Sequence, residues 1–129
     1  MRTLKNFING ESVDAASGQT SELINPTTGE VFASAPVSNA TDVDRAYAAA
    51  TAAFATWRDS TPSERQQALL RSADTFEAHA EELVALESEN TGKPIAVTMS
   101  EEIPPMVDQI RFFAGAARVL EGRSAGEYM

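Results

Sequence analysis

The spacing of the apolar residues changes near residue 40, from short runs separated by turns to the spacing of helices. Before that point, Asn9-Gly10 separates two short apolar runs in "FINGE", a dipeptide typical of a tight β-hairpin because both turn positions need a positive φ. A second turn, "NPTTGE" at residues 25–30, offers proline and glycine between two further runs. Residues 1–37 are therefore predicted to form an N-terminal arm of antiparallel β-hairpins.

Helical spacing after residue 40 predicts three long helices. The first begins at Thr41, which caps the helix together with Asp44 three positions later. The second begins at Thr61 with Glu64 completing its capping box, and it runs from about Pro62 to Asn90. One helical face of each is apolar. The first face contains Val43, Ala46, Tyr47, Ala50, Ala53, Phe54 and Trp57, and the second contains Leu69, Ala73, Phe76, Ala80, Leu83 and either Leu86 or Glu87.

The third helix has two alternative starts. Either Thr98 and Glu101 form a capping box, which would place two prolines inside the helix, or the helix begins at Pro104. Gly92 and Gly122 are predicted to end the second and third helices. The apolar face of the third helix contains Met106, Ile110, Phe113, Ala117 and Leu120.

Charge and residue content exclude several functions. The formal net charge of −9 argues against nonspecific nucleic-acid binding, and no apolar run approaches the length needed to cross a membrane. There is no cysteine, hence no disulfide and no thiolate, and the cytoplasm is the default compartment. The only histidine, His79, lies among acidic residues and is predicted to be a surface residue rather than a metal ligand.

The order and spacing of several motifs resemble the opening of the NAD(P)-dependent aldehyde dehydrogenase superfamily. These motifs are "FINGE", "NPTTGE", the helix start "DVD", and "ENTGKP". The later segment "EIPPMVDQIRFFAGAARVLEG", followed by "AGEY", resembles the branch of aminobutyraldehyde and betaine-aldehyde dehydrogenases. The resemblance covers nearly the whole chain.

The resemblance implies that the chain is an incomplete part of an α/β Rossmann-like cofactor domain. Residues 1–37 would be the β-hairpin arm, residues 38–123 a three-helix segment, and residues 124–129 the start of a bridging or oligomerisation strand. The expected fold class is an α-rich segment with a β-hairpin arm. The expected partners are the remainder of the same polypeptide and, as in the family, one or three further subunits of a homodimer or homotetramer.

The resemblance also implies a reaction in which a cysteine attacks the aldehyde and NAD or NADP accepts hydride. The family's asparagine, glutamate and cysteine of catalysis match no position of this chain, which contains no cysteine. We therefore assign it no catalytic or cofactor-binding residue and predict that it is inactive alone. The alternatives are a catalytically inactive relative and an unrelated small helical interaction module.

The resemblance places the substrate contact of an amino-aldehyde such as 4-aminobutanal at Glu102, with Glu101 and Gln109 beside it. A carboxylate there would attract the distal ammonium of the substrate. The alternative is that both glutamates only favour the positive end of a helix dipole. Pro105 stands where some amino-aldehyde relatives have a second acid.

The resemblance further places a monovalent cation between the backbone carbonyls of Leu23 and Ile24 and the side chain of Asn90. Oxygen ligands suit such a hard cation. Relatives often have aspartate where this chain has Asn90, so weaker binding is expected here. The alternative is that Asn90 only helps to end its helix.

Overall fold

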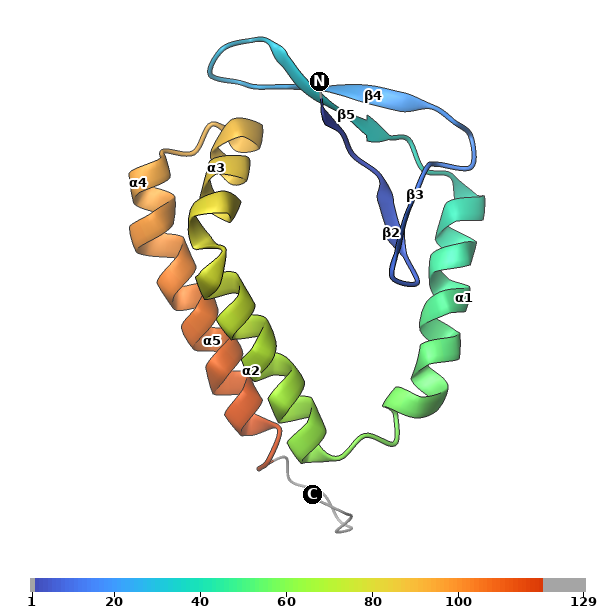
Figure 1. Ribbon diagram of the computed structural model, residues 1–129, viewed down its shortest axis with the longest axis vertical. Helices are drawn as coiled ribbons and strands as arrows, with labels where there is room; N and C mark the ends of the chain where they lie inside the picture. The colour runs from blue at the N-terminus through green and yellow to red at the C-terminus, as the bar shows by residue number, and fades with distance from the viewer. Residues whose placement is uncertain (1, 120–129) are drawn as a thin grey trace. The chain divides into compact units, whose positions relative to one another are not determined.

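The computed structural model describes residues 2–119 and divides into two compact units, Met1–Asp59 and Ser60–Met129 (Figure 1). Each unit is described by itself. The predicted boundary between residues 37 and 38 lies within the first unit. Three predictions fall outside the described residues: Leu120, the helix end at Gly122, and the strand at 124–129.

The first unit contains both predicted hairpins. Strands β2 (Asn6–Ile8) and β3 (Glu11–Val13) pair antiparallel around Asn9 and Gly10, whose φ angles are 55° and 81°. This confirms the turn, because both positions are in the left-handed region that this dipeptide tolerates.

Strands β4 (Thr20–Ile24) and β5 (Val31–Pro36) form the second antiparallel hairpin. Its turn is closed by Asn25, whose carbonyl accepts from the Gly29 N–H at 2.8 Å. Strand β1 (Arg2–Thr3), which pairs parallel to β5, was not predicted. A parallel pair is joined by a long connection, so no local turn marks it.

Helix α1 (Ala40–Trp57) has its cap two residues earlier than predicted. The cap is Asn39, whose side chain accepts from the Thr41 N–H at 2.9 Å, and Asp42 completes the box by accepting from the Asn39 N–H at 3.0 Å. The predicted pair of Thr41 and Asp44 was wrong. The carboxylate of Asp42 also accepts from the distant Ala16 N–H at 2.9 Å, so this acid ties the loop before β4 to the start of α1.

The two backbone N–H donors of Asn39 and Ala16 hold the pKa of the buried Asp42 below its ordinary value of 3.8. The group is therefore ionised in the folded protein at a pH where the unfolded chain is already protonated. Its contribution to stability is complete above the unfolded pKa and is lost as the pH falls through the folded pKa.

Replacement of the observed cap distinguishes it from the predicted one. Asn39→Ala should lower the free energy of unfolding by about 1 kcal/mol, because the first turn of α1 loses its side-chain acceptor. Thr41→Ala is the matched control and should change it by less than about 0.5 kcal/mol, since the Thr41 side chain does not cap. Urea unfolding of the purified protein measures both, and equal losses would contradict the Asn39 cap.

Helix α1 leaves its apolar face exposed within the first unit. Tyr47 is 72% exposed and Phe54 59% exposed. The only buried residue of the helix is the polar Asp42.

The second unit begins with the predicted cap. Thr61 and Glu64 form a capping box at the start of α2 (Pro62–Ala78), which confirms the sequence prediction. The predicted single helix is wrong, because it is interrupted at His79, where φ is −108° and ψ is 19°, and continues as α3 (Ala80–Thr91). Neither glycine nor proline marks this interruption.

The third helical stretch follows neither predicted start. It begins with α4 (Ile95–Val97), widens into a π-helical turn, η1 (Thr98–Glu102), and continues as α5 (Ile103–Ala116). Both prolines thus lie inside a helical stretch. Proline lacks an N–H and crowds the carbonyl four residues earlier, and the wider turn gives that carbonyl more room. No side-chain capping hydrogen bond forms here, and the Thr98 hydroxyl donates to the Pro94 carbonyl at 3.2 Å.

Helices α2 and α5 run side by side and form the main packing contact of the second unit (Figure 1). Small and β-branched side chains make up its core, which contains Ala73, Val84, Val107 and Ala114. The predicted inward position of Phe113 is wrong, since 60% of it is exposed and it packs edge-to-face against Phe112 with ring centroids 5.3 Å apart. The buried face of α5 is instead the one with Val107 and Ala114.

Candidate functional site

A tight turn after α3 positions the first charged group of the site. Gly92 ends the helix with φ at 78°, as predicted, a conformation that costs glycine little. The Thr91 hydroxyl donates to the Glu87 carbonyl at 2.8 Å and accepts from the Lys93 N–H at 3.3 Å. This turn therefore fixes the backbone from which the Lys93 side chain extends.

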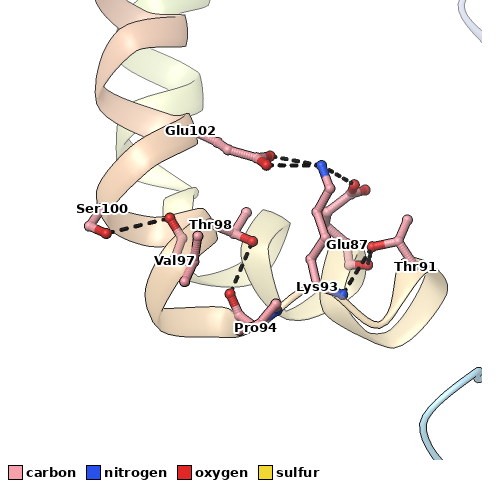
Figure 2. Close-up of polar contacts among 8 residues, drawn as sticks. All are labelled: Glu87, Thr91, Lys93, Pro94, Val97, Thr98, Ser100 and Glu102. Atoms are coloured by element: carbon pink, nitrogen blue, oxygen red, sulfur yellow. Dashed lines mark hydrogen bonds and ion pairs between the residues drawn. The ribbon is translucent and has the colours of Figure 1, made fainter.

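The Lys93 ammonium lies between two carboxylates (Figure 2). Its Nζ is 3.0 Å from each oxygen of Glu102 and 3.3 Å from Oε1 of Glu87. The hydrogen bond to Glu102, followed by that to Glu87, raises the pKa of Lys93 above its ordinary value. Lys93 is thus charged near neutral pH, and the three side chains carry a formal net charge of −1 when both carboxylates are ionised.

A cavity of about 220 Å³ lies beside this ionic cluster. Glu87 and Glu102 line it together with apolar side chains of α2, α3 and α5. The apolar lining includes Phe76, Leu83, Val84 and Met106. A polar end and an apolar wall in one small space suit a short alkyl chain that ends in a cation.

The structure separates the residues predicted to contact substrate. Glu102 lies at the end of the π-helical turn and lines the cavity, as does Met106 one turn later. Glu101 is exposed, and its carboxylate accepts from the Ser100 hydroxyl at 3.3 Å. Gln109 is exposed on α5, and neither Glu101 nor Gln109 lines this cavity.

Sequence reasoning did not select Glu87 or Lys93. Lys93 contacts Glu102, and Glu87 contacts Lys93. The apolar pattern offers Glu87 only as an alternative to Leu86 on the buried stripe, and Lys93 follows the predicted helix end at Gly92. The missing information was how the chain folds back after Gly92. That reversal brings residues nine apart, Lys93 and Glu102, into contact.

The residues of the predicted cation site belong to different units. Leu23 and Ile24 are in β4, at the point where its pairing with β5 becomes irregular. Asn90 is exposed in the last turn of α3. The described residues contain no group of three or more acidic, histidine or cysteine side chains that would hold a metal, but a site of backbone carbonyls is of another type and stays a prediction.

His79 lies on the surface, as predicted. Its Nδ1 is 3.2 Å from Oε2 of Glu82, and 59% of its side chain is exposed.

A different ionic contact joins α2 to α5, where Nη2 of Arg111 is 3.0 Å from Asp74 and 2.6 Å from Glu77. None of the helices in the described part of the chain combines the length and the hydropathy needed to cross a membrane.

Comparison with known proteins identifies the architecture to which this site belongs. The sequence profile of the aldehyde dehydrogenase family matches residues 13–128. The chain is 42% identical over 118 residues to aldehyde dehydrogenase family 2 member B4, mitochondrial, of Arabidopsis thaliana, covering 90% of this chain and 22% of that protein.

Solved structures agree with this match. An NAD-dependent aldehyde dehydrogenase from Sinorhizobium meliloti superposes with a TM-score of 0.87 at 38% identity, covering 95% of this chain and 25% of that one. The NAD⁺ complex of an aldehyde dehydrogenase from Bacillus cereus superposes with a TM-score of 0.84 at 39% identity, covering 88% and 24%. The chain spans about a quarter of the length of these relatives. The helix-rich architecture with few short strands is thus similar to part of their fold, and the chain belongs to the aldehyde dehydrogenase family.

Proposed function

We propose that this segment works within a longer polypeptide, an NAD-dependent aldehyde dehydrogenase, where it supplies the wall that receives the distal ammonium of an amino-aldehyde. The observation that supports the proposal is the placement of Glu102. Its carboxylate lines a small, mostly apolar cavity inside a cluster that retains one negative charge. A substrate such as 4-aminobutanal combines a cation with a short alkyl chain and matches both features.

Oxidation itself is assigned to residues outside this segment. NAD would accept the hydride when bound, but the Glu102 cavity does not fit it, because its two carboxylates would repel a pyrophosphate. What this chain contributes is binding and orientation of the substrate's distal end. Glu101 and Gln109 would extend the proposed site along the same helical stretch.

We propose a homodimer or homotetramer of the whole polypeptide in the cytoplasm, although one relative is by name a mitochondrial protein. A catalytically inactive relative is the remaining alternative, and it would bind amino-aldehydes without oxidising them. Family membership leaves no support for an unrelated helical interaction module.

Glu102→Gln in the whole polypeptide tests the substrate assignment. It should raise KM for 4-aminobutanal roughly two- to fivefold, because a half-exposed carboxylate attracts an ammonium by up to about 1 kcal/mol. Butanal has the same chain length without the cation and should show little change in KM. Steady-state kinetics with both aldehydes measures the difference.

Glu101→Gln is the neighbouring comparison. It removes the same charge from the residue next to Glu102. The Glu101 side chain does not line the cavity, so the effect of this substitution on KM for 4-aminobutanal should be smaller. Equal shifts for both aldehydes with Glu102→Gln would reject the ammonium contact.

A further inference from the structure

We propose that Lys93 and Glu87 determine the specificity of the Glu102 site, with Lys93 as an internal counter-ion that moderates its attraction for a substrate ammonium. This inference rests on the proposed function, since it concerns the same cavity. It assigns roles to two residues that belong to no predicted site.

The cluster has one cation for two anions. Lys93 contacts both oxygens of Glu102 at 3.0 Å and also reaches Glu87 at 3.3 Å, so a single ammonium is shared. Both carboxylates line the same cavity, whereas the lysine approaches them from the turn after α3. The cavity therefore carries the uncompensated charge of the cluster, and an ammonium that enters it would be the second cation.

The backbone keeps the Lys93 ammonium close to this position. The Lys93 N–H is bonded to the Thr91 hydroxyl, which in turn donates to the Glu87 carbonyl, so the turn and the acid of α3 are linked. Pro94 follows the lysine and restricts the turn further, with its φ at −63°. Lys93 therefore competes with any cation that approaches Glu102.

Lys93 has two opposing effects on ammonium binding: it orients the Glu102 carboxylate, and its own charge repels a second cation. The exposure of the three side chains decides which effect is larger. The side chains of Glu87, Lys93 and Glu102 are 41%, 45% and 45% exposed. At such positions water partly replaces a lost partner, so orienting the Glu102 carboxylate matters less than the sum of nearby charges. Removal of the lysine charge should therefore strengthen ammonium binding rather than weaken it.

The test compares KM for 4-aminobutanal with KM for butanal in variants of the whole polypeptide. The measured quantity is the ratio of KM for 4-aminobutanal to KM for butanal. Lys93→Met changes the cluster charge from −1 to −2 and should lower this ratio roughly two- to fivefold. Glu87→Gln changes the charge to zero and should raise the same ratio by a similar factor. Lys93→Arg keeps the charge, so its ratio should stay close to that of the unchanged protein.

Glu81→Gln provides the matched control for Glu87→Gln. It removes the same charge from the same helix at an exposed position that does not line the Glu102 cavity. Its ratio should stay constant. A shift equal to that of Glu87→Gln would mean that the overall charge of the protein, rather than this cluster, sets the ratio, and would overturn the inference.

The outcomes separate this inference from the proposed function. If Glu102→Gln leaves the ratio unchanged, the substrate assignment fails. If Glu102→Gln raises the ratio but Lys93→Met and Glu87→Gln do not move it in opposite directions, only the counter-ion role fails. Thermal unfolding identifies variants that do not fold. Should Lys93→Met be one of them, the rise expected for Glu87→Gln and the unchanged ratio expected for Lys93→Arg still decide the question.

Discussion

The 129-residue chain, purified alone, is expected to form no NADH from NAD⁺ and any aldehyde. The family resemblance implies a cysteine that attacks the aldehyde carbon before hydride transfer, and this sequence contains no cysteine. Serine or threonine would not replace it, because their hydroxyls are weak nucleophiles without an adjacent base, and the only histidine is bonded to a surface glutamate. The expected loss is therefore complete rather than partial.

The absorbance of NADH, followed with 4-aminobutanal and with butanal, measures this outcome. The whole polypeptide assayed in parallel is the positive control, and heat-treated chain provides the background. NADH formation above that background, proportional to the concentration of the 129-residue chain, would contradict the assignment of catalysis to other parts of the polypeptide. Binding of 4-aminobutanal without oxidation would agree with it.

Ala73→Leu should lower the free energy of unfolding of the second unit. Ala73 is fully buried on α2, the helix that packs along α5. A longer side chain there would have to separate the two helices or adopt a strained rotamer, which costs about 1–3 kcal/mol. Urea unfolding followed by the helical circular dichroism signal measures the change.

Ala78→Leu is the control on the same helix. Ala78 is exposed near the end of α2, so the same added volume meets solvent, and the change should stay within about 0.5 kcal/mol. If both variants lost the same stability, the effect would come from leucine in α2 itself and not from the packing of α2 along α5.

Features with a local cause were predicted correctly from the sequence. The turn at Asn9-Gly10, the capping box of Thr61 and Glu64, and the helix end at Gly92 each depend on residues within four positions of one another. Their backbone geometry follows from the conformational preference of glycine and asparagine, or from a side-chain oxygen that meets a nearby N–H. Tertiary contacts do not change such signals.

Features decided by distant contacts were missed. The segment "NATDVD" offers two polar pairs with capping-box spacing, and the Asn39 pair is the one whose acid also meets the N–H of Ala16, 26 positions earlier. The parallel pairing of β1 with β5 also depends on contacts between residues far apart in the sequence. In the candidate site, Glu102 was selected through family resemblance, whereas its contact with Lys93 depends on the reversal of the chain after α3.

The π-helical turn has a consequence for alignment with relatives. Such a turn holds about one residue more than an α-helical turn, because its bonds join residues five apart instead of four. A relative with one residue fewer between 98 and 102 would continue as a regular helix, and its flanking turns would keep nearly the same orientation, because the wider turn takes up the extra residue. A single gap in this short stretch is therefore compatible with an unchanged alignment of the helices on either side of it.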